Sequence, residues 1–227
     1  MCGRSSLTKT EKELEKRFQA TFYSEELERY NPLPNYNVAP TSMCPVIINK
    51  DKNHFHIFRW GLVPFWAKDL KIGASMINAR METVLEKPAF RQAVKSRRCL
   101  VPMDGFYEWK RSATQKTPYR IQVADTDIFA AAGLWEEWHQ PGGNPVFTFT
   151  VLTTDANAFM QPIHDRMPVI LSIEQESLWL DDDISPAELL RQIPPFPSER
   201  MKAYRVSDKV NNVRNNDPSL ILPVEGV

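Results

Sequence analysis

The stretch that decides the fold is YRIQVADTDIFAAAGLW, residues 119–135, in which two apolar segments flank a short polar turn. Tyr119–Val123 and Ile128–Trp135 are both short, rich in apolar residues and bounded by turn-forming residues, as β-strands are. Further runs of this kind lie on either side of the stretch, at Val46–Ile48, Phe55–Trp60, Cys99–Val101, Phe106–Lys110 and Val146–Thr153. The sequence therefore predicts many short strands in antiparallel order.

Helices are predicted around these strands. Thr10 and Glu13 form a capping box, and apolar residues recur at every fourth position from Leu14 to Phe22, so a first amphipathic helix is expected to end at about Phe22. Its apolar stripe is expected to pack on the core.

Prolines and caps mark the other non-strand segments. Residues 31–45 contain four prolines, a density that resists helix and favours an ordered surface loop. Pro88 can open a helix to about Ser96, and Ser185-Pro186 with Glu188 supplies the cap of another. With no internal repeat or linker, we expect residues 1–227 to form a single α+β domain, in which flanking helices surround a curved antiparallel sheet or barrel-like core.

Composition excludes several classes of protein. Three cysteines without a CxxC spacing argue against a disulfide framework and a cysteine zinc site. No apolar run approaches the roughly 18 residues of a membrane span, and no signal peptide is evident. We therefore expect a soluble, cytoplasmic protein. His54 and His56 would supply two metal ligands without a third, so no metal site is predicted.

The net charge is zero, from 28 basic and 28 acidic residues, but the charge is unevenly distributed. Residues 76–120 carry ten Lys or Arg against four Asp or Glu, whereas residues 174–190 carry six acidic side chains and no basic one. A neutral protein with one polyanion-binding face shows this asymmetry, and so does a protein with ordinary solvated charge runs. Both interpretations stay open.

A few polar residues within apolar segments are candidates for chemistry. Asn78 and Arg80 can orient a small oxygen-rich ligand and a phosphate, or simply form a surface turn. Glu108 is either a functional carboxylate or a solvated one above two buried aromatics. His164 can exchange protons near neutral pH or lie in a turn fixed by an ion pair.

The cysteines divide into two kinds. Cys44 and Cys99 lie beside apolar runs and are predicted to be inert core thiols. Cys2 follows the initiator methionine, whose removal would leave a residue with both a free α-amine and a thiol. Taken alone, a cysteine near a chain end is usually a small apolar residue.

Six ordered motifs change that interpretation. They are MCGR at 1–4, YNVAP at 36–40, WGLVPFWA at 60–67, INARMET at 77–83, DGFYEWK at 104–110 and IHDRMP at 163–168. In order and spacing they closely resemble the SRAP family, the SOS-response-associated peptidases, understood as abasic-site processing proteins. The resemblance covers essentially the whole chain.

The resemblance implies a single α+β domain with a barrel-like antiparallel core that binds single-stranded DNA containing an abasic site. It also implies that Cys2 joins covalently to the sugar, within a pocket formed by Asn78, Glu108 and His164. DNA damage and the SOS response are the implied context, and the protein would be nucleoid-associated when bound to DNA.

The DNA contacts are also carried over by motif. Arg4 and Arg80 would contact phosphates, and Trp66 and Pro40 would stack on or wedge against neighbouring bases. We expect a monomer without metal or other cofactor. Ser5 departs from the family, which usually has an aromatic residue at this position.

The expected product is a thiazolidine, formed by the Cys2 amine and thiol with the ring-opened sugar after Met1 has been removed. Weak strand-cleaving lyase activity and self-release, including autoproteolytic removal of Met1, are secondary predictions. Two alternatives from other classes are an N-terminal-cysteine peptidase or amidohydrolase, and a single-stranded DNA-binding module without chemistry.

Overall fold

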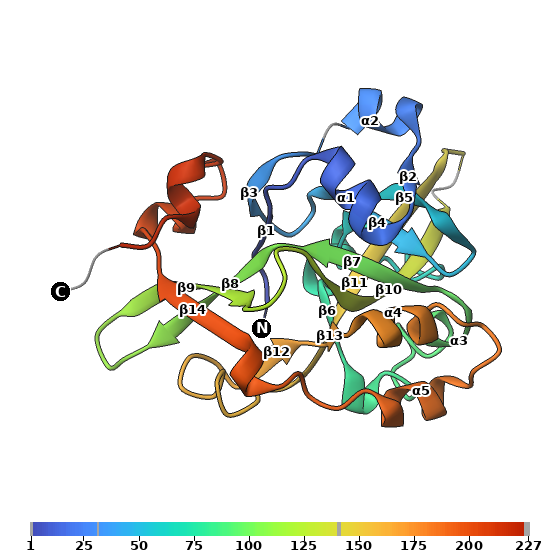
Figure 1. Cartoon of the computed structure of the whole chain (residues 1–227). Helices are drawn as coiled ribbons and strands as arrows, with labels where there is room; N and C mark the ends of the chain where they lie inside the picture. Colours follow the sequence, from blue (N-terminus) through green and yellow to red (C-terminus); the bar gives the residue numbers. More distant parts are fainter. Residues whose placement is uncertain (1, 31, 140–141, 225–227) are drawn as a thin grey trace.

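Five strands close into a barrel at the centre of the computed structural model, which describes residues 2–30, 32–139 and 142–224 (Figure 1). The barrel strands are β4 (Met43–Ile48), β5 (Asp51–Trp60), β7 (Arg98–Met103), β10 (Phe129–His139) and β11 (Pro145–Asp155). β11, β10, β7, β4 and β5 pair antiparallel in that order, and a parallel pairing of β5 with β11 closes the ring. The predicted α+β class with a barrel-like core is confirmed.

A second sheet holds the start of the chain. Its order is β14 (Met201–Arg205), β9 (Lys116–Val123), β8 (Gly105–Arg111), β1 (Ser5–Leu7) and β3 (Asn35–Val38). β1 is antiparallel to both of its neighbours, β8 and β3. Residues of this sheet and of the barrel share one apolar core cluster, which also contains Cys2.

Short elements complete the fold. The remaining strands are β2 (Thr21–Phe22), β6 (Asn78–Arg80), β12 (Arg166–Pro168) and β13 (Ile170–Leu171). The helices are α1 (Glu11–Phe18), α2 (Ser24–Tyr30), α3 (Ala93–Ser96), α4 (Ile173–Trp179) and α5 (Pro186–Gln192). Short 3₁₀ segments lie at Leu70–Ser75, Met81–Thr83, Ser198–Arg200, Asp208–Asn211 and Pro218–Ile221. Within the described ranges, no helix is long and apolar enough to cross a membrane.

Every strand predicted from an apolar run is present, but the first helix is shorter than predicted. The capping box of Thr10 and Glu13 is confirmed. The helix ends at Phe18 because Gln19 takes the left-handed conformation, with φ of 53°. Phe22 instead lies in β2, which pairs parallel to β5, and its ring stacks on that of Phe55 with centroids 4.3 Å apart. The apolar residues thus recur at every fourth position as far as Phe22, although the helix itself ends at Phe18.

Two proline-based predictions also need correction. The predicted loop at 31–45, whose first residue lies outside the described chain, contains β3 and the start of β4. β3 lies between Pro34 and Pro40, so these prolines flank a strand instead of excluding one. The helix predicted from Pro88 reduces to α3, because turns occupy the residues before Ala93. At α5, the predicted cap is present, with Ser185 accepting from the Glu188 amide.

Candidate active site

Cys2 lies just before β1 and is fully buried. The Asn78 side chain donates a hydrogen bond from Nδ2 to the Cys2 carbonyl oxygen at 2.8 Å. Asn78 begins β6, which pairs parallel to β11, and Trp60 Nε1 donates to the carbonyl of the preceding Ile77 at 2.9 Å. The segment 77–80 is therefore a strand edge against the barrel, which corrects the surface-turn alternative.

Glu108 approaches Cys2 from β8. Its side chain is buried, with 3% of the residue exposed, so the solvated-carboxylate interpretation is wrong. Burial raises the pKa of Glu108 to about 7, because a carboxylate loses hydration in this position. Burial, and then the nearby charge of Glu108, raise the pKa of the Cys2 thiol well above its ordinary value. Near pH 7, the thiol is neutral and Glu108 exchanges protons readily.

His164 lies on the other side of Glu108, with its Nε2 3.9 Å from Glu108 Oε2. The amide of Arg166 donates to His164 Nδ1 at 3.0 Å, which fits a neutral ring with its proton on Nε2. Asp165 Oδ1 lies 2.8 Å from the same Nδ1, a contact that would instead require a proton on Nδ1. Burial lowers the pKa of His164, which favours the neutral form at pH 7. A proton on Nε2 then faces Glu108.

Two hollows flank these residues. The first has a volume of about 380 Å³ and is lined by Glu108, Trp109, Arg111, Lys116, His164 and Asn211. The second lies on the Asn78 side, and its lining includes Trp66, Met76, Arg80, Lys87 and Phe90. Asn78, which lines the second hollow, contacts Cys2, and Glu108, which lines the first, lies close to the Cys2 thiol, so each hollow is one residue away from the buried cysteine.

The structure brings some of the predicted DNA contacts together and separates others. Trp66, which is half exposed, and Arg80 line the second hollow together with Asn78. Pro40 lines neither hollow. Arg4 is only 9% exposed, and its Nη1 donates to Asn37 Oδ1 at 2.7 Å and to the Val210 carbonyl at 2.6 Å. Phosphate contacts by Arg4 and base contacts by Pro40 stay predictions.

The sequence reasoning missed the wall of the first hollow. Arg111 and Lys116 were counted only as part of the basic excess in residues 76–120, and Asn211 was not considered. A hairpin prediction would have placed Arg111 and Lys116 near Glu108, because both lie in the short connection between the strands predicted at Phe106–Lys110 and Tyr119–Val123. No local signal in the sequence places Asn211 there, about a hundred residues further along.

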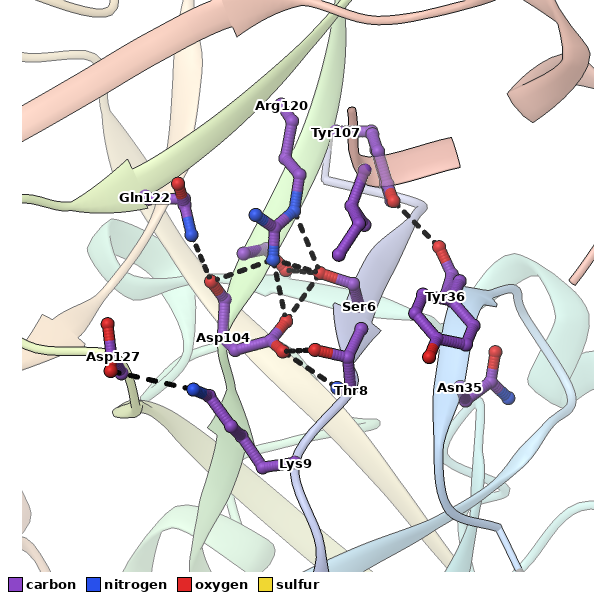
Figure 2. A network of polar contacts seen from close by, with 12 residues as sticks. Ser6, Thr8, Lys9, Asn35, Tyr36, Asp104, Tyr107, Arg120, Gln122 and Asp127 are labelled. Carbon is purple, nitrogen blue, oxygen red and sulfur yellow. Dashed lines mark hydrogen bonds and ion pairs between the residues drawn. The ribbon is translucent and has the colours of Figure 1, made fainter. Parts of the chain in front are cut away.

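A buried polar network holds β1 beside the site (Figure 2). Asp104 accepts hydrogen bonds from Ser6 Oγ, from both the amide and hydroxyl of Thr8, and from Arg120 Nη2 at 3.0 Å. Arg120 also donates to Ser6 Oγ, and Gly105 lies so close beneath its guanidinium that a Cβ there would meet Nε at 2.8 Å. The network joins the N-terminal strand to β8 and β9, and so fixes the position of Cys2.

Ser5, on the other face of β1, has a different environment. It is 5% exposed and lines a small apolar cavity of about 10 Å³ with Val38, Trp60 and Phe149 among its neighbours. An aromatic ring at this position, which the family resemblance predicts, would point toward this core. A serine here therefore bears on packing beneath the site, away from the two hollows.

The fold is a closed barrel, and position 2 holds a cysteine near a buried carboxylate, an imidazole and an asparagine. These features together are those of one protein family. The family model of SOS response associated peptidase (SRAP) matches residues 1–213, and the chain belongs to this family.

Particular relatives carry a more specific name. The abasic site processing protein YoqW of Bacillus subtilis is 46% identical, over 97% of this chain and 99% of its own. The abasic site processing protein HMCES of Pongo abelii is 34% identical, over 85% of this chain and 66% of its own. A crystal structure of a protein from Bacteroides thetaiotaomicron superposes with a TM-score of 0.91 at 31% identity, covering 99% of this chain and all of that one.

Proposed function

We propose that this protein captures abasic sites in single-stranded DNA by forming a covalent cross-link between Cys2 and the ring-opened sugar. The observation that carries the proposal is that Asn78 and Glu108, from distant segments, lie against a buried Cys2, and that His164 from a third segment approaches Glu108. The names of the relatives support the same substrate class. As further expectations, the protein acts as a cytoplasmic monomer and needs no metal or other cofactor.

The chemistry uses both functional groups of an N-terminal cysteine. The α-amine attacks the C1′ aldehyde of the open sugar, and loss of one water gives an imine. The thiol then adds across the C=N bond, forming a C–S bond while its proton passes to nitrogen, and a five-membered thiazolidine results. Ring closure within one molecule can have an effective molarity of about 10⁵ M. Attack by the Cys2 thiol is therefore faster than attack by external thiols.

The α-amine is the better amine for this reaction. With reference pKa values near 7.8 for an α-amine and 10.4 for lysine, it offers roughly 400 times more neutral amine at pH 7. Met1 lies outside the described residues, and the reaction requires its removal because an acylated Cys2 nitrogen is not nucleophilic. We include autoproteolytic removal of Met1, self-release and weak lyase cleavage of the imine as finer parts of the proposal.

The side chains around Cys2 have roles that follow from their proton states. Glu108, with a pKa of about 7, accepts a proton from the ammonium or carbinolamine. His164 is neutral and carries its proton on Nε2. It donates a hydrogen bond from this nitrogen to the ring oxygen of the sugar, which promotes opening of the sugar ring. Asn78 holds the Cys2 carbonyl and so aims the terminus.

A peptidase or amidohydrolase would need Cys2 as a thiolate, and such enzymes lower the thiol pKa with a cationic partner. Here the surroundings raise the pKa of the thiol. This difference favours a reaction that begins at the amine, with the thiol closing the ring afterwards.

The test uses an oligonucleotide with one abasic site, analysed on denaturing gels with and without borohydride. The native protein is expected to give a heat-stable cross-link without reductant, whose mass equals protein plus DNA minus one water. Cys2→Ala keeps an α-amine, so it is expected to cross-link only when borohydride traps the imine. A tetrahydrofuran site, which has no aldehyde, serves as the control and is expected to give no adduct.

Equal cross-linking by Cys2→Ala without borohydride would overturn the mechanism. The rate is also expected to rise between about pH 6 and 8, as the α-amine and Glu108 lose protons. A flat profile in single-turnover measurements would show that none of these groups limits the reaction.

A further inference from the structure

Two cations face each other at the end of the β8–β9 hairpin. Arg111 and Lys116 are directly opposite partners in the antiparallel ladder, and both side chains are exposed. Like charges in this position destabilise a hairpin. Among the described residues, neither side chain has a carboxylate within ion-pair distance, whereas Arg97, Arg98 and Arg120 of the segment 76–120 each have one. An anion bound between them would remove the repulsion.

The pair lies at the candidate active site. Arg111 and Lys116 line the hollow that also contains Glu108 and His164. After burial, the positive charge of Arg111 is among the influences that lower the pKa of His164, so the guanidinium lies close to the imidazole. An anion held here would therefore lie next to the group that contacts the abasic sugar.

Asn211 adds an oriented donor to the same hollow. Trp109 Nε1 donates to Asn211 Oδ1 at 2.7 Å, which fixes the amide and leaves its Nδ2 group free to donate. The segment that carries Asn211 is itself tied down, because Arg4 and Asn37 both donate to the Val210 carbonyl. Two cations and one fixed amide donor thus converge from two separate parts of the chain.

The acidic groups of this region do not cancel the charge. Glu108 is partly protonated near pH 7, and Asp165, 86% exposed, contacts His164 Nδ1 on the side away from Glu108. Guanidinium, ammonium and amide groups together match the oxygens of a phosphodiester.

We propose that Arg111, Lys116 and the Nδ2 group of Asn211 form a subsite for one backbone phosphate of the DNA strand whose abasic sugar reacts at Cys2. The inference rests on the proposed function and deepens it. Arg80 and Lys87 line the second hollow together with Asn78, which contacts Cys2, so we place further phosphates of the same strand in that hollow.

The test compares Arg111→Gln/Lys116→Gln with Lys12→Gln/Lys16→Gln, a control that removes two exposed positive charges from α1. Binding is measured by anisotropy with a tetrahydrofuran-containing strand, which binds without reacting, over a range of salt concentrations. The hairpin variant is expected to bind about tenfold more weakly, with the slope of log K against log salt reduced by about one. The control is expected to match the native protein.

A second measurement locates the phosphate. Single backbone phosphates are replaced, one at a time, by neutral methylphosphonates. At one position, the replacement is expected to weaken binding by the native protein while leaving the hairpin variant unaffected. Thermal melting checks the fold, and loss of the like-charge pair is expected to leave the melting temperature unchanged or slightly higher.

The subsite is overturned if the hairpin variant keeps the affinity and salt slope of the control, or if every methylphosphonate affects both proteins alike. Failure of the proposed function has a different signature, because the native protein would then give no cross-link with abasic DNA whatever the anisotropy shows.

Discussion

Two buried carboxylates, Asp104 just before β8 and Glu108 within it, lie four residues apart in the sequence, and their surroundings differ. Asp104 accepts from two hydroxyls and a backbone amide and pairs with Arg120 at 3.0 Å. Glu108 is equally buried, yet its pKa rises to about 7, and its neighbours include the thiol of Cys2 and the imidazole of His164. The first carboxylate is surrounded by hydrogen-bond donors and a cation, while burial raises the pKa of the second to about 7 and keeps its proton exchangeable at neutral pH.

The comparison shows how one sheet can hold the N-terminal strand rigidly and leave a reactive group beside it. A carboxylate surrounded by donors contributes to stability, and removal of its charge leaves a buried cation without a partner. A carboxylate that is buried with a raised pKa costs stability at neutral pH, and such groups concentrate at functional sites. Opposite effects on folding are therefore expected when each of the two is neutralised.

The largest effect is expected from Asp104→Asn. Arg120, whose side chain is 4% exposed, would lose its counter-charge, and several donors would face an amide nitrogen. Breaking a buried pair in this way costs about 3–5 kcal/mol, measurable as a lower urea midpoint. Asp127→Asn is the matched control, since Asp127 is 85% exposed in its pair with Lys9 and is expected to change stability by under about 1 kcal/mol. Similar losses in both variants would contradict the distinction.

Glu108→Gln is expected to act in the opposite direction. The folded protein holds the Glu108 proton up to about pH 7, whereas the unfolded chain releases it near 4.5, so stability falls as pH rises through this interval. At about 1.36 kcal/mol per pH unit, the penalty reaches about 3 kcal/mol at pH 8 and only about 1 kcal/mol at pH 5. The variant is therefore expected to be more stable than the native protein at pH 8.

The same substitution is expected to slow cross-linking by about 10²-fold or more, because it removes a general base. Urea unfolding at pH 5 and pH 8, with gel-based rates on the same preparations, measures both effects. A variant that is less stable at pH 8, or that cross-links at the native rate, would show that Glu108 belongs with Asp104 as a structural group.

The smallest effects on the free energy of unfolding are expected at two adjacent serines of β1. One contacts Asp104 and the other does not, so the pair tests the same contrast between polar and apolar surroundings. Ser6 is fully buried, donates to Asp104 at 2.6 Å and accepts from Arg120, so Ser6→Ala is expected to cost about 1–3 kcal/mol. Ser5 lies against the apolar cavity on the other face, where its hydroxyl has no hydrogen-bond partner in the described chain. Ser5→Ala is expected to be neutral or slightly stabilising. Equal losses in the two variants, by urea unfolding, would contradict this division of β1.

The sequence predicted the strands well where apolar runs were bounded by turn residues, as at residues 119–135, because burial of both faces leaves a local signature. The end of α1 was wrong, since a single residue, Gln19, ended the helix by its backbone conformation. The short strands β1 and β6 carried no signature of their own, because three residues depend on their neighbours for pairing.

At the candidate site, the motifs identified the residues that could take part in chemistry. They did not predict how deeply these residues are buried or which groups they contact. Burial of Glu108 follows from the packing of the β8 sheet on the barrel, which no window of sequence reports. The inward orientation of Arg4 likewise depends on Asn37 and on Val210, almost at the other end of the chain. Long-range contacts of this kind determine which polar residues face a ligand.

The bond from Arg4 to the Val210 carbonyl also bears on the order of events during synthesis. The first strand needs β8 beside it, and its arginine needs an acceptor that is translated 206 residues later. A nascent chain on the ribosome therefore displays Cys2 long before its surroundings exist, and contacts of such sequence separation form slowly. The candidate pocket is accordingly completed late, once the segment around Val210 has emerged.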